Sequence, residues 1–167
     1  MLLILAVVFN LLTECIDFTL AFPQATLDVD IYMSIPQGFN VDEGNRKDYV
    51  LKLITSLYGL KDASRRWFTL LSESMMKEGR DFKQSVIDSC VFFKEDIIVL
   101  VYVNDCMIIG RDKACIDKFI KSMEKDEEHF SFTREMDLKT YLRVDVKRDK
   151  KKSTSRNHIL RKKLSRR

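Results

Sequence analysis

The chain has 167 residues, of which 46% are hydrophobic and 32% charged, with only five glycines and two prolines. These values exclude a low-complexity or collagen-like chain and allow one globular domain with a core. The net charge of +4 hides an asymmetry, because Lys147 to Arg167 hold eleven Lys or Arg and one Asp, which leaves residues 1–146 acidic. We expect residues 1–146 to fold and residues 147–167 to form a disordered basic tail that is able to attract nucleic acid.

The first nine residues, MLLILAVVF, form an apolar run. It is too short to cross a bilayer, because Asn10, Thr13 and Glu14 interrupt it. A signal peptide is the alternative, but the run lacks a basic start and an Ala-x-Ala-like cleavage site. We therefore expect a buried helix that leads into the first strand, and an intracellular protein, cytoplasmic or nuclear, with no membrane segment.

Strand patterns follow this run. Residues 11–18 are mostly apolar and contain Asp17 near their end, and residues 31–35 alternate between apolar and polar as a half-buried strand does. Residues 49–53 are the expected hairpin partner of that second strand. Further strands are predicted at 90–93, 97–103 and 106–109, with weaker ones at 129–133 and 141–146.

Two helices are predicted between these strands. In residues 64–77 the apolar side chains Trp67, Leu70, Leu71 and Met75 share one helical face, and Gly79 is a stop signal. Asp112 can cap a second helix, whose apolar stripe contains Ile116, Phe119, Ile120 and Met123. Strands with two helices on one face indicate an α+β fold.

Two carboxylates lie where predicted strands end. Asp17 closes the first strand, and Asp105 follows the apolar run 97–103 in the turn sequence Tyr-Val-Asn-Asp. Carboxylates from neighbouring strand ends can share hard cations that bridge to substrate phosphates, which suits phosphoryl transfer. The alternative is structural: Asp17 is then an ordinary strand-end residue, and Asn104-Asp105 forms a tight turn without an ion.

The motifs together resemble the reverse transcriptase domain of Ty1/copia-type retrotransposons. Asp17 is followed by Ala21 and Phe22 at the family's spacing. The later blocks then come in the family's order: they are DIYMSIPQGF at 30–39, LITSLYGLKDASRRW at 53–67, DSCVFF at 88–93 and YVND at 102–105.

The resemblance implies a polymerase palm, an antiparallel sheet with two helices packed on one face, within 1–146. It also implies a fragment of a longer Pol polyprotein, with fingers and thumb incomplete. Its catalytic and Mg²⁺-binding residues would be Asp17 and Asp105, with Asn104 at a third ligand position. Its nucleotide-binding residues would be Phe18, Phe22, Tyr58 and Gly59, and its partners a template-primer of RNA or DNA and deoxynucleotides. Phe22 would exclude a 2′-hydroxyl, although a plain core role is the alternative, and Tyr58-Gly59 could equally be a turn before a helix.

The chain departs from the family where it matters for chemistry. Asn104 stands where the family has the first Asp of its Tyr-Val-Asp-Asp box, so one unit of ligand charge is missing and we expect activity to be crippled or absent. Ser64 replaces a Pro. Ala25 and Arg143 replace glycines, and we expect these two residues to strain the turns that contain them. These changes are typical of a degenerate copy.

The remaining chemistry-bearing residues suggest no second site. Cys15, Cys90, Cys106 and Cys115 form no C-x-x-C pair and have no histidine at zinc spacing, so we expect reduced cysteines. With only His129 and His158, no Ser/His or Cys/His catalytic arrangement is indicated.

Overall fold

A computed structural model describes residues 2–39, 46–125, 130–135, 140–141 and 144–145. The expected disordered tail at 147–167 lies outside these residues. The strands are β1 (Leu12–Phe18), β2 (Thr26–Ser34), β3 (Val50–Thr55), β4 (Lys83–Gln84), β5 (Val91–Lys94), β6 (Ile97–Tyr102), β7 (Asp105–Gly110), β8 (Phe132–Glu135), β9 (Thr140–Tyr141) and β10 (Val144–Asp145). The helices are α1 (Leu2–Val8), α2 (Ala63–Met76) and α3 (Lys113–Glu124), with short 3-10 turns at η1 (Phe22–Gln24) and η2 (Arg46–Asp48).

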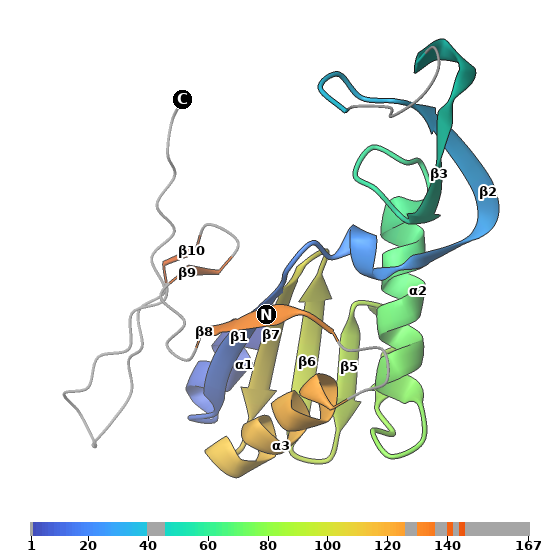
Figure 1. Ribbon diagram of the computed structural model, residues 1–167. Coiled ribbons are helices and arrows are strands. Elements are labelled where there is room, and N and C mark those ends of the chain that lie inside the picture. The colour runs from blue at the N-terminus through green and yellow to red at the C-terminus, as the bar shows by residue number, and fades with distance from the viewer. Residues whose placement is uncertain (1, 40–45, 126–129, 136–139, 142–143, 146–167) are drawn as a thin grey trace.

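The main sheet is antiparallel and has six strands in the order β4-β5-β6-β7-β1-β8 (Figure 1). β1 comes first along the chain but lies inside the sheet, between β7 and β8. The β6–β7 hairpin has a two-residue connection. Because β1 runs antiparallel to β7, the turn of this hairpin and the C-terminal end of β1 lie at the same end of the sheet. This topology places the predicted site residues together.

α2 and α3 cover one face of the main sheet, as predicted (Figure 1). The core between them and the sheet contains the fully buried side chains Ile16, Phe18, Trp67, Leu71, Met75, Phe92, Ile108, Ile116, Ile120 and Met123. Burial of a large apolar side chain contributes about 1.5–3 kcal/mol. Asp112 caps α3 as expected, because its carboxylate accepts the Cys115 N–H at 2.9 Å.

α1 covers part of the opposite face. Ala6, with Leu2 and Leu3, packs against Cys15, Met107 and Ile109 of β1 and β7. The predicted helix before the first strand is confirmed, but its full burial is wrong: Ile4 is 54% exposed and Val8 is 67% exposed. A seven-residue helix has two sides, and only one of them reaches the sheet. None of the helices in the described residues is long and apolar enough to cross a membrane.

β2 and β3 form a separate two-stranded ribbon that projects beyond the main sheet at the end near η1 (Figure 1). Its register pairs Ile31 with Leu53, which confirms the predicted hairpin. The Ser56 N–H donates to the Ala25 carbonyl at 2.8 Å and joins the ribbon's base to the chain after η1. Ala25 has φ −90°, an ordinary value, so the expected strain at this position is wrong. Arg143 lies outside the described residues.

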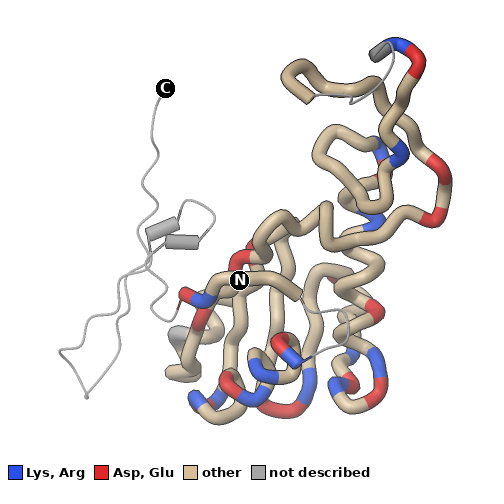
Figure 2. Tube along the Cα trace, viewed as in Figure 1, with Lys and Arg blue, Asp and Glu red and all other residues tan. Residues whose placement is uncertain are grey.

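The weaker predicted strands are only partly recovered. β8 overlaps the strand predicted at 129–133 in Phe132 and Thr133, and the segment predicted as one strand at 141–146 holds β10 and only the last residue of β9, which pair antiparallel. Lys, Arg, Asp and Glu gather at the end of the main sheet that carries the β5–β6 and β7–α3 connections (Figure 2). Both signs of charge are interspersed there.

Candidate functional site

Asp17 and Asp105 are direct partners in the antiparallel register of β1 and β7. Side chains alternate between the faces of a strand. Ile16 and Phe18 point into the core under α2, so Asp17 between them points to the other face, where it is exposed. Directly opposed residues in an antiparallel pair share a face, so Asp105 lies on this open face beside Asp17. The prediction that strand ends bring these two residues together is confirmed.

The turn before Asp105 consists of Val103 and Asn104, because Asp105 is already the first residue of β7. Val103 has φ +57°, the left-handed region that a β-branched residue rarely adopts. A positive φ at the first position of a two-residue hairpin turn usually calls for glycine. The alternative interpretation, a tight turn formed by Asn104-Asp105, is therefore wrong in its residues. The turn is Val103-Asn104, and Val103 is strained.

Asn104 ties this turn to the end of β1 through its backbone and its side chain. Its carbonyl accepts the Phe18 N–H at 2.9 Å, and its Nδ2 donates to Asp17 Oδ1 at 2.6 Å. If the amide were flipped, Asn104 Oδ1 would lie against Asp17 Oδ1, and two acceptor oxygens would face each other. Asn104 Oδ1 therefore points away from Asp17. The side chain at the third ligand position that the resemblance implies is thus a donor toward the Asp17 carboxylate.

Electrostatics at the site disfavour two free negative charges. Burial, followed by the negative charge of Asp17, raises the pKa of the Asp105 carboxyl above its usual value of 3.8. Burial likewise raises the pKa of the Cys15 thiol, on the same face of β1, to about 12, with the charge of Asp105 as the next cause. Cys15 therefore stays a neutral, free thiol, as expected of a core cysteine.

The donor set does not fit the two magnesium ions that the family's chemistry implies. Two bridged divalent ions need several anionic oxygens between them. Within the described ranges, no three or more His, Cys, Asp or Glu side chains cluster closely enough to hold a metal ion. Asp17 and Asp105 supply two carboxylates, and one oxygen of Asp17 is occupied by the Asn104 amide.

The structure brings the expected nucleotide-binding residues Phe22 and Tyr58 together. Their ring centroids are 4.6 Å apart and the planes are tilted by 36°. Tyr58 remains 58% exposed, and Phe22 is partly buried. Gly59 has φ +98°, and the Leu60 N–H donates to the Leu57 carbonyl, so Tyr58 and Gly59 occupy the centre of a tight turn that requires glycine at its second position.

Phe18, also expected at the nucleotide, has its side chain inside the core. It is 2% exposed and makes edge-to-face contacts with Trp67, Phe130 and Phe132. Its ring therefore points away from the open face, and only its backbone lies at the site. Phe18 positions its neighbour Asp17 through this packing.

Sequence reasoning missed the part that Trp67 plays at the site. Its indole N–H donates to the Val103 carbonyl at 2.7 Å, so a buried residue of α2 holds the turn that carries Asn104. The apolar pattern of α2 signalled only a core residue. Trp67 is the one tryptophan of the chain.

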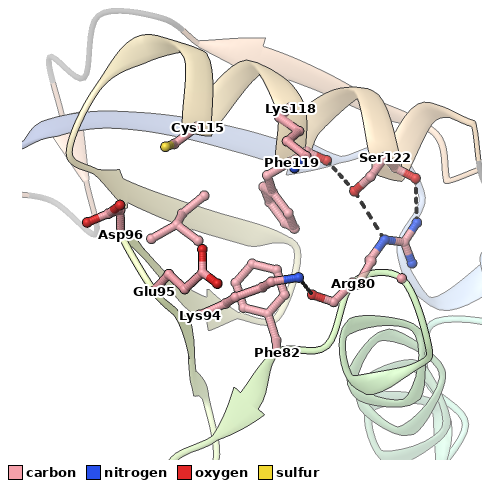
Figure 3. A pocket seen from close by; sticks show the side chains of 11 residues that line it. Arg80, Phe82, Lys94, Glu95, Asp96, Cys115, Lys118, Phe119 and Ser122 are labelled. Atoms are coloured by element: carbon pink, nitrogen blue, oxygen red, sulfur yellow. Dashed lines mark hydrogen bonds between the residues drawn. The ribbon is translucent and has the colours of Figure 1, made fainter.

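A small cavity of about 140 Å³ lies between α3, the β5–β6 turn and the segment after α2 (Figure 3). Its polar side chains connect these elements: Arg80 donates to the Ser122 carbonyl at 2.6 Å, and Lys94 donates to the Arg80 carbonyl at 2.9 Å. Ligand sites usually measure about 300–1,000 Å³. The cavity is also at the end of β6 opposite to Asn104, so it is separate from the carboxylate pair.

Comparisons with known proteins agree with the arrangement of these motifs. Residues 1–163 match the family described as reverse transcriptase (RNA-dependent DNA polymerase). The chain is 39% identical over 126 residues to a retrovirus-related Pol polyprotein from a transposon of Nicotiana tabacum, and 36% identical over 137 residues to one from Arabidopsis thaliana. These alignments cover 72% and 80% of the chain but 9% of each relative.

A transposon Ty5-1 protein of Saccharomyces cerevisiae is 30% identical over 113 residues, which cover 65% of the chain and 35% of that protein. No solved structure matches the chain. The family match spans nearly the whole sequence, and the relatives are transposon polyproteins from plants and yeast. The chain therefore belongs to the reverse transcriptase family, as the reverse transcriptase domain of a Ty1/copia-type Pol polyprotein.

Proposed function

We propose that this chain is the palm of an RNA-directed DNA polymerase whose catalytic step is crippled by Asn104. The observation that carries the proposal is the hydrogen bond from Asn104 Nδ2 to Asp17 Oδ1. It puts a neutral donor where the family's chemistry needs an anionic ligand. The antiparallel sheet with Asp17 and Asp105 in register on its open face supports the assignment to a palm.

The reaction of such a palm is template-directed addition of deoxynucleotides to a primer, on RNA or DNA. Asp17 and Asp105 would hold Mg²⁺ in an active relative, and Phe22, Tyr58 and Gly59 would line the nucleotide. The Phe22–Tyr58 ring contact supports this part of the proposal, because it fixes an aromatic surface five residues after Asp17. Phe22 would select against a ribose 2′-hydroxyl.

Primer extension with Mg²⁺ tests the proposal. The wild type is compared with Asn104→Asp, and the double variant Asn104→Asp with Asp17→Asn serves as the inactive control. We expect Asn104→Asp to extend the primer at least about tenfold faster, because a restored ligand is worth several kcal/mol in the transition state. Equal extension by the wild type and Asn104→Asp would contradict the crippling role of Asn104.

The chain spans about a tenth of the plant relatives, so the same comparison is also made in a larger protein. Residues 1–146, with or without Asn104→Asp, replace the matching region of an active Ty1/copia-type polymerase. We expect the chimera that carries Asn104→Asp to extend the primer at least about tenfold faster than the chimera that keeps Asn104. Equal extension by the two chimeras would overturn the proposal even if neither isolated chain extends a primer.

A second candidate function is nucleic-acid binding through Lys147 to Arg167. The eleven Lys or Arg residues in this segment favour it, because basic runs bind phosphate backbones with release of counterions. Binding to a short RNA or DNA duplex should fall steeply as salt is raised, and it should disappear when residues 147–167 are deleted. Binding that survives the deletion would instead assign nucleic-acid affinity to residues 1–146.

A further inference from the structure

Trp67 contacts both strand ends of the candidate site. Its ring lies 5.0 Å from the ring of Phe18, centroid to centroid, in an edge-to-face contact. Its Nε1–H donates to the carbonyl of Val103 at 2.7 Å. Phe18 follows Asp17 directly, and Val103 precedes Asn104. One buried side chain on α2 therefore touches the neighbours of both residues that form the Asp17–Asn104 hydrogen bond.

The turn needs such a partner because Val103 is strained. A β-branched residue with φ +57° is disfavoured, and such a conformation persists only where its surroundings hold it. The indole N–H is a donor that must be satisfied when buried, and Trp67 is 1% exposed. The Val103 carbonyl satisfies it only while the turn keeps its present shape.

We propose that Trp67 is a positioning residue of the site, which holds the strained Val103 turn so that Asn104 reaches Asp17. Its packing against Phe18 fixes the end of β1, and its hydrogen bond fixes the turn between β6 and β7. A backbone hydrogen bond, from the Phe18 N–H to the Asn104 carbonyl at 2.9 Å, joins the same two segments directly. The functional meaning of this inference rests on the proposed palm site, but its geometry does not.

Nuclear magnetic resonance tests the geometry without any activity. The chain has one tryptophan, so its indole N–H gives one signal. We expect this signal to exchange slowly with solvent, as a buried hydrogen-bonded group does, and to shift in Asn104→Asp, which leaves Trp67 unchanged but alters the turn. An indole N–H that exchanges as fast as free indole would overturn the proposal.

A substitution then separates the hydrogen bond from core packing. Trp67→Phe keeps an aromatic ring and removes the donor, and we expect the side-chain amide protons of Asn104 to exchange roughly fivefold or more faster, the effect of losing one hydrogen bond. Phe119→Leu is the control, because it alters the same core far from the turn. The Asn104 amide signals are assigned by their loss in Asn104→Ala.

Val103→Gly should restore the Asn104 amide protection that Trp67→Phe removes. If Trp67 only filled the core, Val103→Gly would restore nothing. Glycine adopts a positive φ without strain, so the turn should keep its shape without the indole. We expect Asn104 amide protection to return in the double variant Trp67→Phe with Val103→Gly. The proposal is overturned if Trp67→Phe leaves the Asn104 amide unchanged, if Phe119→Leu loosens it equally, or if Val103→Gly restores nothing. Primer extension tests the palm assignment separately. If no primer is extended, the exchange measurements still test the role of Trp67.

Discussion

The side-chain amide of Asn104 donates a hydrogen bond to the carboxylate of Asp17, 87 residues earlier in the chain, at 2.6 Å. A metal ion and an amide N–H both stabilise a carboxylate, but only the ion brings the positive charge that can bridge the carboxylate to a phosphate. The hydrogen bond therefore allows β1 and the β6–β7 turn to meet without a cation. Under the proposed function, this same contact is what disfavours catalysis.

Asn104→Asp should make the stability of the protein depend on divalent cations. Without metal, the variant loses the amide hydrogen bond and gains a third carboxylate, and we expect a loss of about 1–2 kcal/mol. Mg²⁺ or Mn²⁺ at ten times its Kd should return about 1.4 kcal/mol. Thermal unfolding with and without metal measures both changes.

Asn104→Ala is the control for this prediction. It loses the hydrogen bond without adding a charge, so it should be destabilised and remain unresponsive to metal. A metal-induced rise in Tm of the wild type as large as that of Asn104→Asp would show that the Asp17–Asn104 bond does not prevent metal binding.

Asp105→Asn should stabilise the protein at neutral pH. Because burial and Asp17 raise the pKa of the Asp105 carboxyl, the folded state binds that proton more tightly than the unfolded state does. The cost of its charge is absent below the usual pKa of 3.8 and fully present above the raised pKa. The advantage of Asp105→Asn should therefore be present at pH 7 and shrink toward pH 3.

Urea unfolding of the two proteins across this pH range measures the difference in unfolding free energy. Glu73→Gln, at an exposed position on α2, is the control for the removal of one carboxylate elsewhere on the protein. A constant difference between Asp105→Asn and the wild type at every pH would contradict the prediction.

Local signals in the sequence predicted much of the fold, because caps and periodicity act over a few residues. α3 begins where Asp112 predicts it, and the β6–β7 hairpin follows its two apolar runs. The pairing of Asp17 with Asp105 also followed from the rule that strand ends meet at sheet edges. The sequence could not indicate that Trp67 would hold the turn, because nothing local links residue 67 to residue 103.

Other parts of the site depend on distant contacts or on small energy differences. The strained turn at Val103 was missed because its residue type argues against a positive φ. The two-residue strand β4 is too short to show alternation. The partners of Glu14 were missed because they come from α3 and β8, about a hundred or more residues later.

Glu14 anchors the edge strand β8 to β1 and α3. Its side chain is 6% exposed, and it accepts from Arg134 Nε at 2.7 Å and pairs with Lys113 at 3.4 Å. Arg134 also pairs with Asp117 of α3. Removing one partner of a buried pair usually costs about 3–5 kcal/mol, but Arg134 is 26% exposed and keeps Asp117, so we expect about 2 kcal/mol for Glu14→Ala.

Chemical unfolding of Glu14→Ala, Arg134→Ala and the double variant measures the coupling. We expect the double variant to lose less than the two single variants together. Asp117→Asn is the matched control, because its carboxylate is more exposed than that of Glu14, and it should cost less. Strict additivity of Glu14→Ala and Arg134→Ala would show that their contact contributes nothing to stability.

Gly110, the last residue of β7, should resist substitution because of space rather than backbone strain. A Cβ there would lie 2.6 Å from Cγ1 of Ile116, a fully buried residue of α3. Such overpacking costs about 1–3 kcal/mol, and we expect Gly110→Ala to fall in this range by thermal or urea unfolding. Gly79→Ala is the contrast, since that position has φ +90° and open space around it.

The two glycines should respond differently to a cavity at Ile116. Ile116→Ala removes Cγ1 and Cδ1, the two closest atoms that the new Cβ would meet, so the added cost of Gly110→Ala should be much smaller in that background. The cost of Gly79→Ala comes from its positive φ and should be the same in both backgrounds. If Gly110→Ala costs as much in the Ile116→Ala background as in the wild type, the close approach of β7 and α3 is not what requires glycine at this position.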